Sequence, residues 1–202
     1  MQFDQRIVMV TGAAGNLGRA VAAAFEALGA TVVRLGRKDA VERELERHGR
    51  VDVLCNIAGA FRMGKPLHET TDEDWDFLFD ANAKTVLKMS RAVVPSMIRN
   101  GGGKIVNVGA YAALKGAAQM GAYVASKSAV IRLTETMAAE LREKNINVNC
   151  VLPTIIDTPE NRKAMPDADR SNWVAPADLA NVIVFLASPA ARAIHGAAIT
   201  VG

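Results

Sequence analysis

Short apolar runs alternate along the chain with longer segments in which apolar residues recur at helical spacing. Continuous apolar runs are typical of strands that are buried on both faces of a parallel sheet, and the periodic segments are typical of amphipathic helices. The predicted strands are 6–10, 30–35, 51–57, 104–108, 146–152 and 197–201, and the predicted helices are 16–28, 39–48, 72–100, 123–143 and 177–186. This alternation predicts an α/β fold, a parallel sheet covered on both faces and joined by right-handed crossovers.

Composition indicates one domain. The chain has 202 residues, of which 50% are hydrophobic, and we expect a single domain spanning residues 1–202. The net charge is only +3 and no dense basic cluster occurs, so we expect no nucleic-acid partner. No signal peptide opens the chain and no apolar run reaches membrane-spanning length, so we expect no membrane association.

Few residues suit metal or disulfide chemistry. Cys55 and Cys150 each lie in a predicted apolar strand, and we expect two buried free thiols in a cytoplasmic protein. The three histidines are scattered beside polar residues without the spacing of metal ligands. The sequence therefore predicts no metal site.

A glycine-rich loop joins the first predicted strand to the first predicted helix. Gly12, Gly15 and Gly18 allow a tight turn, a close approach of the backbone to a pyrophosphate, and packing of the helix on the strand. Asn16 and Leu17 begin the helix, whose free N–H groups and positive dipole end attract phosphate. A glycine motif alone is a weak signal, but its place between strand and helix predicts a Rossmann-type, doubly wound dinucleotide-binding sheet.

The end of the second predicted strand bears on the choice of nucleotide. NAD sites often place an acid there for the adenosine ribose, whereas NADP sites use a basic residue for the 2′-phosphate. Leu35 is followed after one glycine by Arg37 and Lys38, and the Arg37 guanidinium suits a phosphate. The sequence favours NADP(H) over NAD(H), although Asp39 leaves a ribose contact open.

Tyr123 and Lys127 stand four residues apart in a predicted helix, within the sequence GAYVASK. This spacing places both side chains on one helix face, and an ammonium beside a phenol lowers the phenol pKa. The pair therefore suggests a tyrosine that exchanges protons near neutral pH. The same spacing also occurs in ordinary surface pairs, so the pair alone does not decide the chemistry.

Taken in order, the motifs resemble those of the short-chain dehydrogenase/reductase family over nearly the whole chain. The matching stretches are TGAAGNLG at 11–18, NIAG at 56–59, Asn82 within DANAKT, the Tyr123/Lys127 pair, and PTIIDTP at 153–159. The resemblance implies that Tyr123 passes the proton, Lys127 lowers its pKa and holds the nicotinamide ribose, and Asn82 helps to hold a water chain. It also implies a homodimer or homotetramer, built through helices 72–100 and 123–143.

The resemblance also implies a set of cofactor contacts. Thr158 corresponds to the residue that contacts the nicotinamide carboxamide. The full set of expected cofactor-binding residues is Gly12, Gly15, Asn16, Leu17, Gly18, Arg37, Asn56, Ala58, Gly59, Lys127, Pro153, Ile155 and Thr158. We further expect a substrate pocket lined by Tyr111, Met120, Met165 and Trp173, with residues 160–173 as a mobile lid.

One family residue is missing, because Ala110 occupies the position of the usual serine. An alanine cannot donate a hydrogen bond to a substrate carbonyl. The dihydropteridine reductase subgroup resembles this chain in that alanine, in the glycine spacing and in the stretch from 152 to Trp173. The resemblance implies an electron-poor substrate such as a quinonoid dihydropterin. A general carbonyl or 3-oxoacyl-type reductase and a non-catalytic NADP-binding protein remain the alternatives.

The segment between Leu35 and Val51 is short. It has room for one helix, whereas the family usually has a helix, a third strand and a further helix there. The sequence therefore predicts either a sheet that lacks its third, edge strand or a chain that lacks a segment.

Overall fold

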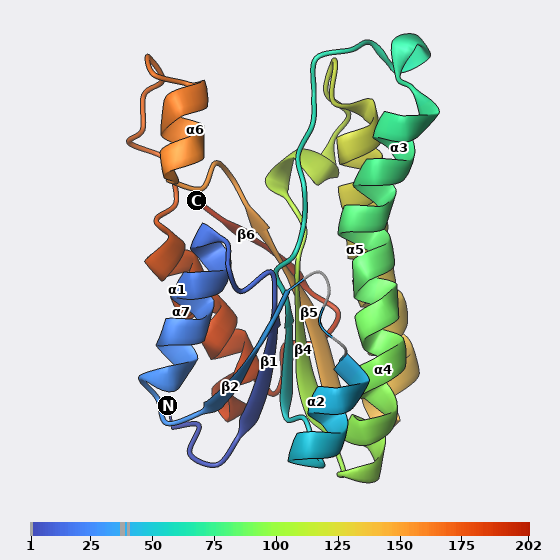
Figure 1. Ribbon diagram of the computed structural model, residues 1–202, viewed down its shortest axis with the longest axis vertical. Helices are drawn as coiled ribbons and strands as arrows, with labels where there is room; N and C mark the ends of the chain where they lie inside the picture. The colour runs from blue at the N-terminus through green and yellow to red at the C-terminus, as the bar shows by residue number, and fades with distance from the viewer. Residues whose placement is uncertain (1, 37–38, 40) are drawn as a thin grey trace.

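Six parallel strands form the centre of the molecule (Figure 1). The computed structural model describes residues 2–36, 39 and 41–202. The strands are β1 (Ile7–Thr11), β2 (Thr31–Leu35), β3 (Val53–Asn56), β4 (Gly103–Val108), β5 (Ile146–Pro153) and β6 (Ala198–Val201). They are ordered β2-β1-β3-β4-β5-β6, and each neighbouring pair is parallel. The prediction of an α/β, doubly wound parallel sheet is confirmed.

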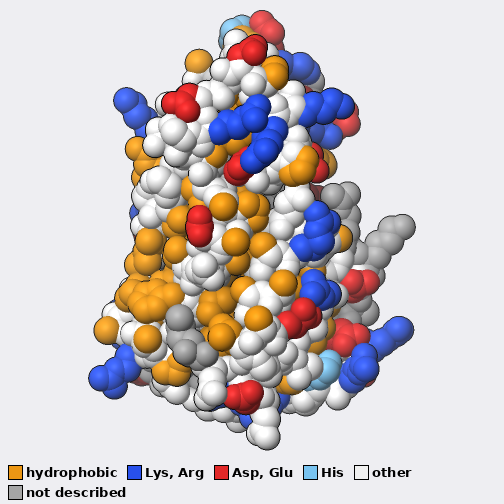
Figure 2. Space-filling model, turned by 90° about the vertical axis from the view of Figure 1, so that its left-hand side faces the viewer, with side chains coloured by type: hydrophobic (Ala, Val, Ile, Leu, Met, Phe, Trp, Pro, Cys, Tyr) orange, Lys and Arg blue, Asp and Glu red, His pale blue; other side chains and the backbone are white. Residues whose placement is uncertain are grey.

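Helices cover both faces of this sheet. One layer holds α1 (Asn16–Glu26) and α7 (Pro176–Ala187), and the other holds α2 (Val41–His48), α4 (Thr85–Arg99) and α5 (Gly121–Leu141) (Figure 1). Side chains of β1 alternate between the layers, since Val8 and Val10 join the core under α1 and α7 while Met9 joins the other core. Figure 2 shows the first layer, where apolar side chains lie over α1 and α7, below the charged ones over α6 (Pro159–Ala164). Within the described ranges, no helix is long and apolar enough to cross a membrane.

The strand order reverses at β1. The chain runs from β1 outward to β2, and then returns through α2 to β3 on the other side of β1. In the described part of the chain β2 is the edge of the sheet, which confirms the expectation of a sheet without the usual third strand. Ligands of such sheets bind at the carboxyl ends of the strands where the order reverses, here between β1 and β3.

Two stretches differ from the sequence prediction. The predicted helix 72–100 consists of α3 (Asp72–Phe79), a π-helical turn (Asp80–Lys84) and α4. Helix α6 lies in the stretch predicted only as a lid, because six residues are too few to establish an apolar period. Thr71 is the N-cap of α3, and its hydroxyl accepts a hydrogen bond from the Asp74 N–H at 3.2 Å.

Candidate active site

The glycine loop is packed against the end of β3. The Thr11 hydroxyl accepts hydrogen bonds from the N–H groups of Ile57 and Ala58, at 3.0 and 3.1 Å. Gly12 has a φ of +64°, and a Cβ there would lie 2.9 Å from the Ala58 Cα. A Cβ on Gly18 would lie only 2.2 Å from the Gly12 carbonyl oxygen. Both positions therefore require glycine, as expected for a loop that cradles phosphate.

The start of α1 is open to an anion. Gly15 is the N-cap and supplies no side-chain cap, and the first turn carries no acidic residue. Leu17 is buried and anchors the helix start in the core. The Asn16 side chain points toward α6 instead of into the core, and its Nδ2 donates to the Glu160 Oε2 at 2.6 Å. The unpaired N–H groups at this helix start fit a pyrophosphate.

The end of β2 holds a carboxylate. The Gly36 N–H donates to the Asp39 Oδ2 at 2.5 Å, which places Asp39 at the tip of the strand. Arg37, predicted to bind the 2′-phosphate, and Lys38 lie outside the described residues. The described part of this tip thus offers an acceptor of the kind that a ribose hydroxyl uses.

The Asn56 side chain is buried and bonds to the neighbouring strand β4. Its Nδ2 donates to the Asn107 Oδ1 of β4 at 2.8 Å, and the Asn107 Nδ2 donates to the Thr134 hydroxyl of α5 at 2.9 Å. Asn56 is only 1% exposed. Three residues further on, Gly59 brings the backbone close to two polar groups, since a Cβ there would lie 2.9 Å from the Asn82 Oδ1 and 3.0 Å from the Lys127 Nζ.

Asn82 joins three parts of the site. Its Oδ1 accepts from the Ala60 N–H at 2.8 Å, and its Nδ2 donates to the Ala60 carbonyl at 3.1 Å and to the Ser126 hydroxyl at 2.9 Å. Ser126 in turn donates to the Tyr123 carbonyl at 2.8 Å. Asn82 lies in the π-helical turn, a feature that recurs at functional sites. The side chain therefore fixes the loop after β3 against the turn that carries Tyr123.

Tyr123 and Lys127 both lie in α5, in surroundings that disfavour their charged forms. The Tyr123 ring packs edge-on against Phe61, with ring centroids 4.8 Å apart, and burial raises the pKa of Tyr123 to about 12. The Lys127 ammonium donates to the Val108 carbonyl at 2.8 Å, and burial lowers the pKa of Lys127 to about 8. The expectation that Lys127 lowers the tyrosine pKa is wrong for this arrangement, because burial dominates and the ammonium is directed to Val108.

Burial of Lys127 makes stability depend on pH. Between pH 8 and its ordinary pKa of 10.5, the unfolded chain holds a proton on this lysine that the folded chain has released, so stability rises with pH. We expect the unfolding free energy of the wild type, relative to Lys127→Met, to increase by about 3 kcal/mol across this window. Urea unfolding of both proteins at several pH values measures the difference, and parallel curves would show that Lys127 titrates normally.

Ala110 lies two residues after the end of β4, where the family serine is expected. It is 6% exposed in extended backbone, and the neighbouring Tyr111 is 51% exposed. The hydroxyls of Ser126 and Ser128 on α5 both donate to backbone carbonyls, at 2.8 Å. Neither hydroxyl is thus free to replace the missing serine as a donor.

The segment after β5 combines three of the expected cofactor contacts. Pro153 ends β5 and Ile155 is 39% exposed, with its carbonyl accepting from the Val174 N–H at 2.8 Å. The Thr158 hydroxyl caps α6, accepting from the Asn161 N–H at 3.2 Å. Thr158 therefore has a structural bond in this arrangement, in addition to its expected contact with the carboxamide.

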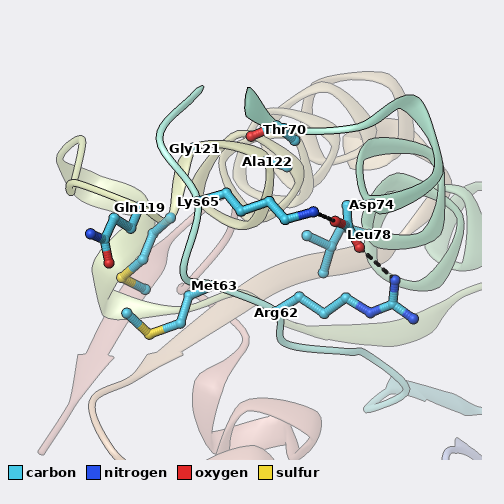
Figure 3. Close-up of a pocket in the computed structure, with 10 residues that line it drawn as sticks. Arg62, Met63, Lys65, Thr70, Asp74, Leu78, Gln119, Gly121 and Ala122 are labelled. Atoms are coloured by element: carbon cyan, nitrogen blue, oxygen red, sulfur yellow. Dashed lines mark hydrogen bonds and ion pairs between the residues drawn. The ribbon is translucent and has the colours of Figure 1, made fainter. Parts of the chain in front are cut away.

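A cavity beside Tyr123 differs from the pocket predicted from sequence. Figure 3 shows this cavity, whose volume is about 190 Å³. Met120 is the one predicted pocket residue among those that line it. The prediction that Tyr111, Met165 and Trp173 line a pocket does not hold for this cavity. Phe61, Arg62 and Lys65 were not predicted to be site residues. Two cations within four residues after an aromatic side chain are nevertheless a sequence pattern that could have indicated a charged binding site.

Known proteins resemble this chain in sequence. A family model described as enoyl-(acyl carrier protein) reductase matches residues 37–202. The 3-oxoacyl-[acyl-carrier-protein] reductase of Thermotoga maritima is 32% identical over 97% of this chain and 96% of its own. The 2-dehydro-3-deoxy-D-gluconate 5-dehydrogenase of Escherichia coli is 36% identical over 80% of this chain and 68% of its own. The first alignment has 237 positions against 202 residues here, so the relative has a segment without a counterpart.

Solved structures share the fold. A short-chain type dehydrogenase/reductase from Mycobacterium ulcerans superposes with a TM-score of 0.93 at 26% identity, over 100% of this chain and 90% of that one. A second structure, from Beutenbergia cavernae, is described as an NAD(P)-dependent gluconate 5-dehydrogenase and holds NADP at low occupancy. It superposes with a TM-score of 0.87 at 27% identity, over 98% of this chain and 96% of that one. With these matches and the geometry of the site, the chain belongs to the short-chain dehydrogenase/reductase family.

Proposed function

We propose that this NAD(P)-dependent oxidoreductase transfers hydride to an electron-poor, conjugated small molecule, for which a quinonoid dihydropterin is the model substrate. The observation that carries the proposal is Ala110, which places a methyl group where a ketone reductase needs a hydroxyl. A quinonoid ring regains delocalisation when it accepts hydride, and it therefore needs less electrostatic help than a simple ketone. We also propose that residues 1–202 act as one dinucleotide-binding domain.

The residues around the crevice fit a bound dinucleotide. The open start of α1 and the glycines at 12, 15 and 18 would hold the pyrophosphate, while Ala58 and Gly59 would line the crevice and Asn56 would support it from the sheet. Pro153, Ile155 and Thr158 would hold the carboxamide. When bound, the nicotinamide supplies the hydride.

The proton side of the reaction falls to α5. Tyr123 holds its proton at neutral pH, as an ordinary phenol does, and burial raises its pKa further, so the protonated phenol can donate to the reduced substrate. Lys127 would hold the ribose with its ammonium, which donates to the Val108 carbonyl in the structure. Asn82 would hold the loop after β3 and a water chain that returns the proton.

Replacing Ala110 by Ser tests the choice of substrate class. We expect Ala110→Ser to leave reduction of quinonoid dihydropterin within about two-fold, because that reaction does not use the hydroxyl. Carbonyl reduction is the second candidate, favoured by relatives whose names specify a 3-oxoacyl reductase and a sugar-acid dehydrogenase. Under that candidate the restored donor raises kcat/KM for a ketone by about 100-fold. Steady-state rates with both substrates separate the candidates.

For the nucleotide we propose NADP(H), on the strength of Arg37 and Lys38 in the sequence. Asp39 at the tip of β2 weighs toward NAD(H), so the preference is open to a direct test. We expect Arg37→Gln to raise the Kd of NADPH by about ten-fold and to change the Kd of NADH by less than two-fold. Fluorescence titration with both nucleotides measures this, and equal losses would remove Arg37 from 2′-phosphate recognition.

We further propose a homodimer or homotetramer assembled through α3, α4 and α5. Trp75, Leu87 and Ile98 are large apolar residues of α3 and α4 that are 38%, 38% and 42% exposed. Burial of these side chains against a second copy would remove apolar surface from water. The buried, unpaired thiols of Cys55 and Cys150 suit the reducing cytoplasm that we propose as the location.

A further inference from the structure

The cavity of about 190 Å³ beside Tyr123 has no part in the roles proposed above. Three segments form its walls: the loop after β3, helix α3, and the residues just before and at the start of α5 (Figure 3). Arg62, Met63 and Lys65 come from the loop, and Asp74 and Leu78 come from α3. Each wall thus belongs to a different element of the fold.

This cavity adjoins the reacting tyrosine. Ala122 lines it and directly precedes Tyr123, while Phe61, whose ring packs on Tyr123, directly precedes Arg62. The Gly64 N–H donates to the carbonyl of Gln119, another lining residue, at 3.0 Å, which ties the loop to the segment before α5. Tyr123 does not itself line the cavity, but lining residues directly precede Tyr123 in α5 and directly follow Phe61 in the loop.

Among the residues that line the cavity, two cations face one carboxylate. The Arg62 Nη1 lies 2.7 Å from the Asp74 Oδ1, and the Arg62 guanidinium carbon lies 3.7 Å from the centroid of the Phe77 ring, so this cation is held from two sides. The Lys65 Nζ lies 3.5 Å from the Asp74 Oδ2, on a side chain that is 54% exposed. Lys65 is the looser partner, and the lining carries one positive charge that Asp74 does not match.

Other acids stand nearby without lining the cavity. Asp72 and Glu73, in the same helix turn as Asp74, are exposed and lie outside the lining. The remaining lining combines apolar and neutral polar groups: buried Leu78 and Ala122, the thioethers of Met63 and Met120, Gly121, and the side chains of Thr70 and Gln119. A lining with apolar side chains and one unmatched positive charge suits a ligand that has an apolar body and one anionic group.

We propose that this cavity binds a carboxylate or phosphate group when the substrate carries one, with Lys65 and Arg62 as its partners, so that an acidic derivative of the conjugated substrate binds more tightly than the neutral parent compound. The link to catalysis rests on the proposed function of Tyr123. The anion would compete with Asp74 for the two cations, and this competition gives the proposal a distinctive test.

Ligand-observed ¹⁹F NMR with the full-length protein, alone and saturated with NADPH, measures binding without turnover. The probes are 4-fluorobenzoate, 4-fluorophenyl phosphate and the neutral 4-fluorobenzamide, at matched ionic strength. We expect the Kd of the tighter acid to be at least about five-fold below that of the amide, and the ranking of the acids identifies the anionic group. Lys65→Gln should raise this Kd about five-fold, as for a partly exposed ion pair.

The direction in which Asp74→Asn changes the Kd of the acid distinguishes an anion site from a structural ion pair. We expect this substitution to lower the Kd of the acid about three-fold, because it removes the competing carboxylate and keeps the side-chain shape. The matched controls are Asp76→Asn on the same helix and Lys88→Gln on α4, which lie outside the lining and should leave the Kd unchanged.

Equal affinities for acid and amide would overturn the inference. So would weaker acid binding in Asp74→Asn, since that result would mean that the Arg62–Asp74 pair only holds the loop in place. Because binding is measured without turnover, a failure of catalysis at Tyr123 leaves this test intact. The two proposals therefore fail separately.

Discussion

Tyr123→Phe should lower kcat by at least about 100-fold while the affinity for NADPH changes by less than about two-fold. The substitution removes only the phenolic hydroxyl. The ring keeps its edge-on contact with Phe61, and the bond from Ser126 goes to the backbone carbonyl of residue 123, which is unchanged. Rates of NADPH oxidation and a fluorescence titration of nucleotide binding measure the two quantities.

The control for this substitution is Tyr111→Phe. Tyr111 is the other tyrosine of the chain, it is 51% exposed, and we assign it no role in proton transfer. Its loss of a hydroxyl should change kcat by less than about two-fold. Full turnover in Tyr123→Phe would remove Tyr123 as the proton donor under both candidate functions, whereas equal losses in both variants would indicate a general effect of removing a hydroxyl.

Gly18→Ala should weaken NADPH binding by more than about ten-fold and lower the free energy of unfolding by about 2 kcal/mol. The new Cβ would lie 2.2 Å from the Gly12 carbonyl oxygen and 2.7 Å from the Ala13 Cα. Both neighbours are backbone atoms, so the phosphate loop or the start of α1 must move to make room. Urea unfolding and nucleotide titration measure the two losses.

Gly116→Ala is the matched control. A Cβ at Gly116 meets no heavy atom within 4 Å, so the same chemical change should alter neither stability nor nucleotide affinity beyond a few tenths of a kcal/mol. Normal nucleotide binding by Gly18→Ala would mean that the loop between β1 and α1 is not the pyrophosphate site.

The sequence was most informative where a single local signal decides the structure. Apolar runs located all six strands, because the inner strands of a sheet covered on both faces are mostly apolar, even though single polar residues such as Asn56 and Asn107 occur in them. Glycine at 12, 15 and 18 located the tight loop between β1 and α1. The short segment after Leu35 predicted either a sheet without its third strand or a chain that lacks a segment, and the described sheet has β2 at its edge.

Features that depend on packing were not readable. The π-helical turn that carries Asn82 needs the bonds to Ala60 and Ser126, residues that are 22 and 44 positions away. The spacing of Tyr123 and Lys127 predicted that they share a helix face, but not that Lys127 would donate to Val108 or that burial would control both pKa values. The spacing of two residues in sequence predicts whether their side chains share a helix face, but it does not predict how far burial will shift their pKa values.

The cavity next to Tyr123 illustrates the same limit. Arg62 and Lys65 follow β3, Asp74 is on α3 and Ala122 is on α5, so no local pattern brings them together. The proposed anion site is inferred from two cations and one carboxylate that line the same cavity, and only the folded structure shows that they do.

The first experiment is to titrate the purified protein with NADPH and with NADH, and then to add quinonoid dihydropterin while following absorbance of the reduced nucleotide. We expect saturable nucleotide binding, tighter for NADPH, and oxidation that depends on the protein and is lost in Tyr123→Phe. Failure to bind either nucleotide, or binding with no oxidation of the nucleotide by the pterin or by a ketone, would contradict the assignment of a hydride-transfer site at Tyr123.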